Sequence, residues 1–395
     1  MASTLSDEKF QPSRRVTENP PYAFATISSK VQAMQAQGKD VIRLDIGNPD
    51  MPPAPHIIDT LAEQSQVSAN HGYGGYTGIP ALRAAMADYY QTRYGVTLDP
   101  NKEVLPLIGS KEGIANLHLA WLNPGDLALV PDPGYIAYVI GPSLAGGEAV
   151  LFPLTADKGW LPDFSTIPLA QAEKAKMIWL NYPNNPTGAV ADLAFFEEAI
   201  AFCRKHSILL CHDNPYSDVT FDGYDPVNPL QVPGAKDVVI EFNSLSKTYN
   251  MAGWRVGMAV GNETAVQALG RIKTQIDSGT SFPIQHMAIS AIHGEQDWLV
   301  ERNRIYQERR DLVMDALSQM GLDIPAPKAT FYIWFPAPTE YTDMEFHEKL
   351  LQEAHVSIAP GSIYGEQGNN WMRLSIGLST TRLKEALGRM KQMVG

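Results

Sequence analysis

The chain has 395 residues, of which 44% are hydrophobic and 19% are charged, so it can bury a core and lacks the composition of a disordered protein. It carries 31 Lys and Arg against 43 Asp and Glu, and this formal net charge of -12 disfavours nonspecific binding to nucleic acid or to an anionic membrane. The length favours about two to three domains.

Signals for secretion, membrane insertion and metal binding are missing from the sequence. Residues 1–15 lack the apolar segment of a signal peptide, and no stretch reaches the roughly 18 apolar residues of a membrane helix. Two cysteines, Cys203 and Cys211, are too few for a disulfide scaffold or a structural zinc site, and no H-E-x-x-H string occurs. We therefore expect a soluble, cytoplasmic protein with no metal, membrane or nucleic-acid partner.

The first predicted element is a helix that begins at Pro80 and ends at Gly95, because proline is favoured in a first helical turn and glycine stops a helix. Its inward side chains are expected to be Leu82, Met86 and Tyr89 or Tyr90.

The middle of the chain alternates short apolar runs with helical patterns, one of them spanning Asp192 to His206. Strands buried on both faces read as continuous apolar runs, so this alternation indicates an α/β fold with a largely parallel sheet. The predicted strands are Leu127 to Val130, Ala149 to Phe152, Met177 to Leu180, Ile208 to Cys211, Val238 to Phe242 and Val256 to Val260.

The C-terminal part is predicted to form a smaller α+β unit. It follows a long helix from Trp298 to Met320. The expected strands and helices after it are Thr330 to Phe335, Val356 to Ala359 and Trp371 to Ile376 (strands), and Asp343 to Ala354 and Thr381 to Met393 (helices).

The chemistry of the chain is most visible around Lys247, which follows an apolar strand in the string Ser244-Leu-Ser246-Lys247. A lysine can form an imine with an aldehyde, while Ser244, Ser246 and Arg255 supply groups that bind a phosphate. The pattern suits a phosphate-bearing aldehyde, although an ordinary turn has the same composition.

Two further polar strings follow predicted strands directly. Asn185 lies in Asn-Tyr-Pro-Asn-Asn-Pro-Thr-Gly, and Asp213 begins Asp-Asn-Pro-Tyr216. Residues just past the carboxyl ends of parallel strands line the ligand crevice, so we expect Asn185, Asp213 and Lys247 to converge. Loop capping is the alternative for each string taken alone.

Together, from about Asp45 to Gly377, these strings resemble the pyridoxal phosphate-dependent aminotransferases of class I and II, fold type I. The resemblance implies a large domain with a mostly parallel seven-stranded sheet, inserted between N- and C-terminal pieces of a smaller α+β domain. We expect an N-terminal arm and part of the small domain at 1–50, the cofactor domain at 51–290 and the C-terminal small domain at 291–395.

The resemblance also assigns roles. Lys247, Asp213 and Tyr216 would be catalytic: Lys247 bonds the cofactor and moves the substrate proton, Asp213 pairs with the pyridine nitrogen, and Tyr216 and Asn185 contact the phenolic oxygen. Gly47, Asn185 and Arg373 would bind the substrate carboxylate. The remaining cofactor contacts would be Ser110, Lys111, Ser244, Ser246 and Arg255 at the phosphate, Tyr135 stacked on the ring, and Tyr73 from the neighbouring subunit of a homodimer.

The substrate prediction depends on the strings Ala329 to Trp334 and Gly47 to Asp50, which look most like LL-diaminopimelate aminotransferases and their alanine/aspartate-type relatives. This resemblance implies an L-amino acid donor and 2-oxoglutarate as acceptor. A broad aspartate, alanine or aromatic aminotransferase and a C–S β-lyase remain alternatives. A pyridoxal-binding transcriptional regulator is disfavoured, because no basic DNA-binding module precedes the fold. His212, beside Asp213, either supports that aspartate or packs as an ordinary histidine.

Overall fold

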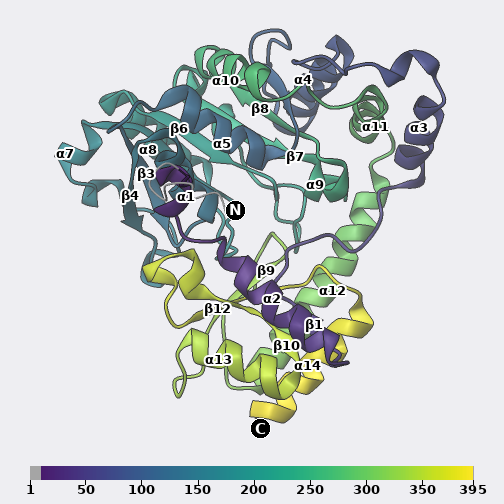
Figure 1. Ribbon diagram of the computed structural model, residues 1–395, viewed down its shortest axis with the longest axis vertical. Coiled ribbons are helices and arrows are strands. Elements are labelled where there is room, and N and C mark those ends of the chain that lie inside the picture. Colours follow the sequence, from purple (N-terminus) through teal and green to yellow (C-terminus); the bar gives the residue numbers. More distant parts are fainter. Residues whose placement is uncertain (1–9, 395) are drawn as a thin grey trace, which may run out of the picture.

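The structure is a computed structural model that describes residues 10–394, and within them seven strands form one sheet (Figure 1). The strands lie in the order β2-β8-β7-β6-β5-β3-β4. Their bounds are β2 (Val104–Leu107), β3 (Leu127–Asp132), β4 (Glu148–Pro153), β5 (Ala175–Leu180), β6 (Leu209–Asp213), β7 (Val239–Ser244) and β8 (Gly257–Gly261). β8 runs antiparallel to β2 and β7, and the other neighbouring pairs are parallel. The α/β class and the mostly parallel sheet are confirmed.

Helices cover both faces of this sheet (Figure 1). One face packs against α3 (Pro55–Ser65), α4 (Pro80–Tyr94), α8 (Leu193–His206) and α11 (Phe282–His293), and the other against α5 (Ser110–Trp121), α6 (Ile136–Ala145) and α10 (Glu263–Ile276). On β5, Ile178 and Leu180 enter the first core while Met177 and Trp179 enter the second, because successive strand side chains point to opposite faces. Double-sided burial explains the continuous apolar runs.

Six of the strands lie where the apolar runs predict them, with ends shifted by a residue or two. β2 is not among the predicted strands, because Pro106 argues against one; the strand lies at the edge of the sheet, where proline is tolerated. Helix α4 spans the predicted range, with its inward side chains buried and Gly95 left-handed at its end (φ 68°).

A smaller part of the molecule combines segments from both ends of the chain. β1 (Ile42–Arg43) pairs in parallel with β10 (Val356–Ser357), and β11 (Ala359–Pro360), β12 (Trp371–Ser375) and β9 (Tyr332–Pro336) form an antiparallel sheet. The helices beside them are α2 (Ala23–Ala36), α12 (Asp297–Gln319), α13 (Asp343–Lys349) and α14 (Thr380–Val394). This arrangement agrees with a small α+β unit built from both termini.

Two predicted elements of this part differ from the structure. The run 356–359 forms two strands in different sheets, because the chain leaves β1 after Ser357 and meets β12 at Ala359. The helix predicted for 343–354 is α-helical only to Lys349 and continues as a π-helical turn, Leu350–Ala354, which ends at left-handed His355 (φ 52°).

The ranges 1–50, 51–290 and 291–395 stay a prediction, and residues 1–9 and 395 of them lie outside the described residues. The remaining short helices are α1 (Arg14–Thr17), α7 (Leu169–Ala172) and α9 (Leu245–Thr248). None of the helices within 10–394 has the length and apolar character needed to cross a bilayer.

Candidate active site

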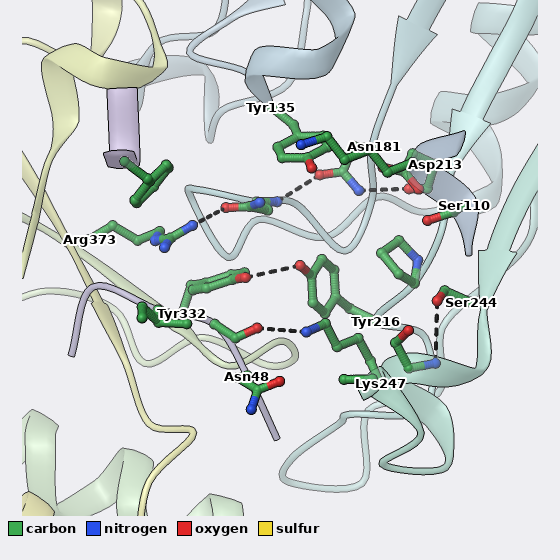
Figure 2. Close-up of a pocket in the computed structure, with 18 of the residues that line it drawn as sticks. Asn48, Ser110, Tyr135, Asn181, Asp213, Tyr216, Ser244, Lys247, Tyr332 and Arg373 are labelled. Atoms are coloured by element: carbon green, nitrogen blue, oxygen red, sulfur yellow. Dashed lines mark hydrogen bonds between the residues drawn. The ribbon is translucent and has the colours of Figure 1, made fainter. Parts of the chain in front are cut away.

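A cavity of about 510 Å³ lies where the carboxyl ends of β5, β6 and β7 face the smaller sheet (Figure 2). It therefore occupies the position that ligands take in parallel α/β sheets. The predicted site residues that line it are Gly47, Ser110, Lys111, Tyr135, Asn185, Asp213, Tyr216, Ser244, Ser246, Lys247, Arg255 and Arg373.

Tyr73 is the predicted site residue that the structure does not bring to this cavity. Its side chain is 87% exposed, and it does not belong to the cavity lining. Its reach into a second subunit stays a prediction.

Lys247 lies in the short helix α9, which starts as β7 ends. Ser244 caps this turn, because its Oγ accepts the backbone N–H of Ser246 at 3.2 Å. The Nζ of Lys247 donates to the carbonyl of Gly47 at 2.6 Å (Figure 2). Burial, helped by the nearby charges of Arg255 and Arg373, lowers the pKa of Lys247 to about 8. Roughly a tenth of this amine is therefore uncharged and nucleophilic at pH 7, far more than for a solvated lysine.

Cofactor uptake should consequently depend on pH with a midpoint near the pKa of Lys247. Because only the uncharged amine attacks an aldehyde, we expect the rate of reaction with pyridoxal phosphate to rise about tenfold per pH unit below the transition. The rate should level off near pH 8. Stopped-flow absorbance of the cofactor-free enzyme measures this profile, with a lysine peptide as control. A rate that still climbs at about pH 10, as for a solvated lysine, would contradict it.

Asp213 ends β6 with its carboxyl group fully inside the protein. Its Oδ2 accepts the hydroxyl of Tyr138 at 2.5 Å, whereas its Oδ1 is buried without a hydrogen-bond partner. Burial raises the pKa of Asp213 to about 6, although the Tyr138 hydrogen bond opposes the shift. An unpartnered buried oxygen needs a donor, and the ring nitrogen of the expected cofactor is a suitable one.

Another part of the cavity is a candidate anion site. Ser110 begins α5 and lines the cavity, so the free backbone amides of this helix start lie at the same place as the Ser110 side chain. Neither Lys111 nor Arg255 has a carboxylate within ion-pair distance among residues 10–394, although Arg255 donates to Ser246 Oγ at 3.4 Å. Two cations without anionic partners fit a phosphate.

Close packing against Arg255 leaves no room for a side chain at Gly109 in this candidate anion site. Gly109 is left-handed (φ 80°), and a Cβ there would lie 2.1 Å from Arg255 Nη2. Any side chain at this position would displace the arginine, and the left-handed backbone is itself strained for other residues.

Arg373 comes from β12, and its guanidinium points into the cavity (Figure 2). Its Nη1 donates to Asn185 Oδ1 at 2.9 Å and its Nη2 to the Asp45 carbonyl at 2.6 Å, while its Nε is buried without a partner. The guanidinium also lies 4.1 Å from the ring centre of Tyr332. Within the described chain its contacts are neutral oxygens and the rings of Tyr332, Tyr364 and Phe24, so the charge remains available to a substrate carboxylate.

The Tyr332 side chain leaves no room for a side chain at Gly47. A Cβ at this position would lie 1.9 Å from Tyr332 Oη, so only glycine fits. The Tyr332 hydroxyl also shares a 3.0 Å hydrogen bond with Tyr216 (Figure 2). Whether Tyr216 and Asn185 contact the cofactor's phenolic oxygen stays a prediction.

Several residues of the site are absent from the sequence prediction. Tyr138 lies behind the lining and bonds Asp213; it follows the expected ring-stacking Tyr135 by one helical turn, a spacing that could have indicated it. Tyr22 and Phe24 come from α2, and Arg43 and Asp45 from β1 and the loop after it. No motif marks these four, because they reach the cavity only through the pairing of the N-terminal segment with β10.

Buried Arg302 of α12 holds the backbone of the lysine turn. Its guanidinium donates to the carbonyls of Lys247 (3.1 Å), Thr248 and Asp218, and it is only 2% exposed. Within the described chain no carboxylate lies within ion-pair distance of it. Helix α12 thus supplies hydrogen-bond donors to the last carbonyls of α9 from the side of the smaller sheet.

Replacing Arg302 with methionine should lower the free energy of unfolding by about 3 kcal/mol, because the carbonyls of Lys247 and Thr248 lose their side-chain donor, whereas the Asp218 carbonyl keeps the Asn303 amide at 2.9 Å. Urea denaturation followed by circular dichroism measures the change. The matched control is Arg304→Met on the exposed face of the same helix, which should change stability by less than about 0.5 kcal/mol. Equal effects of the two variants would argue against the role given to Arg302.

Comparisons with known proteins agree with this geometry. The family model "Aminotransferase class I and II" matches residues 39–390. The chain is 49% identical over 385 residues to the LL-diaminopimelate aminotransferase of Moorella thermoacetica, covering 98% of this chain and 99% of the relative. It is also 49% identical over 386 residues to that of Desulforudis audaxviator, covering 98% of each. The solved structure of apo-BacF from Bacillus subtilis aligns with a TM-score of 0.93 at 40% identity, over 97% of this chain and 98% of that one. The chain therefore belongs to the class I and II aminotransferases, as its motifs predict.

Proposed function

We propose that this aminotransferase moves an amino group from LL-diaminopimelate to a 2-oxo acid, with 2-oxoglutarate as the expected acceptor. The observation that carries the proposal is the 49% identity, across 98% of this chain, to a protein named LL-diaminopimelate aminotransferase. The enzyme would then act in lysine biosynthesis.

The cofactor is pyridoxal phosphate, on which this family depends. When bound, it supplies an aldehyde that joins amines and a ring that accepts electrons from the substrate. The residues of the cavity fit it at three points. Counting the described residues alone, Asp213 has an unpartnered buried oxygen for the ring nitrogen, and Lys111 and Arg255 lack anionic partners for the phosphate. Lys247 has a reactive amine for the aldehyde.

We assign the proton transfers to side chains whose positions suit them. Lys247, freed by the incoming amine, would take the proton from the substrate α-carbon and return it on the cofactor side. Asp213, buried and ionised, would hold the ring nitrogen protonated. Arg373 would orient the substrate through its carboxylate, which fixes the α-carbon next to Lys247.

The distal end of the substrate needs its own polar partners, because diaminopimelate carries a second ammonium and a second carboxylate. Besides the residues assigned above, the described lining offers Arg43 and Asp45 as charged groups. Arg43 Nε donates to Asp45 Oδ1 at 3.0 Å. This pair supports a donor with a charged distal group over a purely apolar one.

The same catalytic and binding residues could carry out two other functions. A broad aspartate, alanine or aromatic aminotransferase would share Lys247, Asp213 and Arg373, and a C–S β-lyase would use them to expel a leaving group.

A donor panel separates these three possibilities. The purified holoenzyme is given LL-diaminopimelate, meso-diaminopimelate, aspartate, alanine, phenylalanine and cystathionine, each with 2-oxoglutarate, and glutamate, pyruvate and ammonia are measured. We expect kcat/KM for LL-diaminopimelate to exceed that for each other donor by about 100-fold or more. Equal or higher values for aspartate, alanine or phenylalanine would overturn the substrate proposal, and pyruvate with ammonia from cystathionine would indicate a lyase.

We further propose a homodimer in which Tyr73 reaches the phosphate of the partner's cofactor. Its support is that Tyr73 and Tyr76 are 87% and 55% exposed and so are available to a second subunit. The proposed location is the cytoplasm, which agrees with Cys203 and Cys211 being free thiols in the described chain.

Tyr73→Phe tests the shared site. Loss of a hydrogen bond to a charged group should weaken cofactor retention by roughly 10- to 100-fold, measured by equilibrium dialysis, with the molecular mass followed by light scattering. Tyr76→Phe is the matched control and should retain the cofactor normally. A fully active monomer would contradict the shared site.

A further inference from the structure

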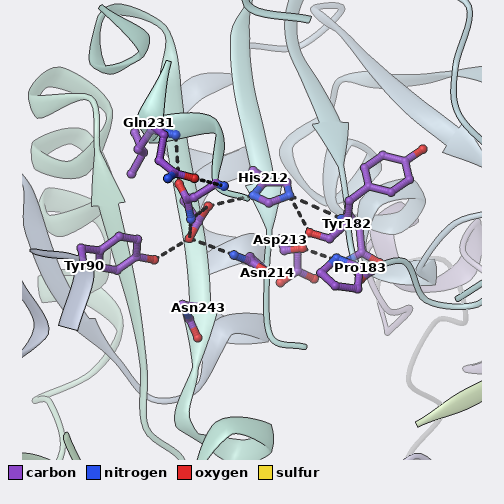
Figure 3. Close-up of polar contacts among 12 residues, drawn as sticks. Tyr90, Tyr182, Pro183, His212, Asp213, Asn214, Gln231 and Asn243 are labelled. Carbon is purple, nitrogen blue, oxygen red and sulfur yellow. Dashed lines mark hydrogen bonds and ion pairs between the residues drawn. The ribbon is translucent and has the colours of Figure 1, made fainter. Parts of the chain in front are cut away.

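A buried carboxylate lies beside the proposed partner of the cofactor ring (Figure 3). Glu241 of β7 is 0% exposed. Its oxygens meet His212 of β6, Tyr90 of α4, and the amides of Asn214 and Asn228. Among residues 10–394, His212 is the one group within 4.0 Å that can carry a positive charge.

The hydrogen bonds indicate that Glu241 is ionised. Asn228 Oδ1 accepts the backbone N–H of Leu230 at 2.9 Å, so its amide nitrogen must face Glu241, where it donates to both carboxylate oxygens at 2.8 Å. The Tyr90 hydroxyl adds a third donor at 2.6 Å. A carboxylate surrounded by donors has no acceptor for a proton of its own.

His212 has proton acceptors at both ring nitrogens. Its Nδ1 lies 2.8 Å from Glu241 Oε2, and its Nε2 lies 3.1 Å from the carbonyl oxygen of Tyr182 (Figure 3). The backbone nitrogen of Tyr182 is farther from Nε2, at 3.4 Å. The Tyr182 N–H can donate to Nε2 at that longer distance, whereas the shorter contact with the carbonyl favours Nε2 as the donor. A ring that donates from both nitrogens is an imidazolium.

We propose that His212 and Glu241 form a buried imidazolium–carboxylate pair that positions Asp213 and keeps its carboxyl group ionised. His212 and Asn214 both contact Glu241 and flank Asp213 in the chain, while Asn181 Nδ2 donates to the Asp213 carbonyl at 2.6 Å. The neighbours of Asp213 are thus held on both sides. This inference rests on the proposed role of Asp213 at the cofactor ring.

Electrostatics around the pair agree with this role. Burial raises the pKa of Asp213, and the charge of adjacent His212 opposes that rise more than Glu241 adds to it. The other titratable groups near Glu241 are Tyr90 and Tyr94. Burial raises the pKa of both hydroxyls above the usual range, so they stay neutral. His212 touches no reacting atom, and it acts as a positioning residue through Asp213.

Nitrogen-15 NMR of the holoenzyme, labelled at its nine histidines, reports the protonation state directly. We expect both ring nitrogens of His212, assigned by their loss in His212→Asn, to show imidazolium shifts at neutral pH. His118 is an internal control: its Nδ1 lies 2.8 Å from the Ile114 carbonyl, its Nε2 accepts the Trp179 indole N–H, and burial lowers its pKa to about 4. His118 must therefore appear neutral. A neutral His212 in the same spectrum would overturn the proposal.

Two variants separate charge from hydrogen bonding. Glu241→Gln keeps the shape and removes the charge, so His212 should lose its second proton, and kcat should fall about tenfold while KM changes less than about twofold. Tyr90→Phe removes a neutral donor and should leave the imidazolium signal in place. An imidazolium that persists in Glu241→Gln would also overturn the proposal. If that variant does not fold, the wild-type spectrum decides. The NMR result is independent of which amino acid is the donor, so it stands apart from the substrate proposal.

Discussion

Replacing Lys247 with alanine should lower kcat by more than about 10⁴-fold, because the variant loses both the amine that bonds the cofactor and the base at the substrate α-carbon. The Nζ of this lysine sits in the cavity, 2.6 Å from the Gly47 carbonyl, and no other lysine besides Lys111 lines the cavity in the described chain. Lys111 lies near Arg255 at the candidate anion site, so we do not expect it to substitute for Lys247. Absorbance of the lysine-bound cofactor should disappear together with turnover.

The control for this variant is Lys102→Ala, which removes a lysine with 57% side-chain exposure from the surface. Its kcat and its absorbance spectrum should match those of the unmodified enzyme. Lys247→Arg is a second comparison, because it keeps the positive charge without a nucleophilic amine. Turnover in Lys247→Ala at the level of the Lys102 control would remove Lys247 from the mechanism.

Arg373→Gln should lower kcat/KM for every amino acid donor by about 100- to 1,000-fold, mainly through a higher KM. The loss corresponds to the roughly 3 to 4 kcal/mol of a buried, hydrogen-bonded charge pair. Because the guanidinium contacts neutral oxygens and aromatic rings and has no ion-pair partner among residues 10–394, a substrate carboxylate would be its first anionic partner. Steady-state kinetics with several donors measure the effect.

The comparison that isolates the carboxylate is a donor without one. A simple alkylamine should react with the bound cofactor at the same rate in the variant and the parent enzyme, whereas an amino acid should react more slowly in the variant. Arg382→Gln on α14, where the arginine is 39% exposed, controls for loss of a positive charge. An unchanged KM in Arg373→Gln would eliminate its carboxylate role.

Sequence could predict the parts of this fold that depend on local pattern. Apolar runs mark the buried strands because both faces of the sheet are covered, and polar strings mark the cavity because they begin where β5 and β6 end. These strings therefore predict that Asn185, Asp213 and Lys247 share one cavity, and all three line it.

Other parts depend on contacts between distant segments, which no local pattern contains. Lys247 meets Gly47 across 200 positions of the chain. Tyr138 sits in an apolar helix and reads as core, although its hydroxyl bonds Asp213. β2 contains Pro106, which argues against a strand unless the strand lies at the edge of a sheet, and the sequence does not reveal that β2 does. These features arise from how distant segments pair. The same residue types also occur at positions that make no such contacts, so the residue type alone does not predict them.

The pairing of β1 with β10 also sets the order in which the enzyme can be completed during its synthesis. Residues 42–43 leave the ribosome more than 300 residues before their partners 356–357. At about 5 to 20 residues per second, that interval is roughly 15 seconds to a minute. All strands of the seven-stranded sheet have been synthesised long before then. The segment with β1 and Gly47, in contrast, has no partner strand until β10 is made. The residues proposed to contact the cofactor ring and phosphate can thus be in place early. The contacts proposed for the substrate are the last part of the site to form on the nascent chain.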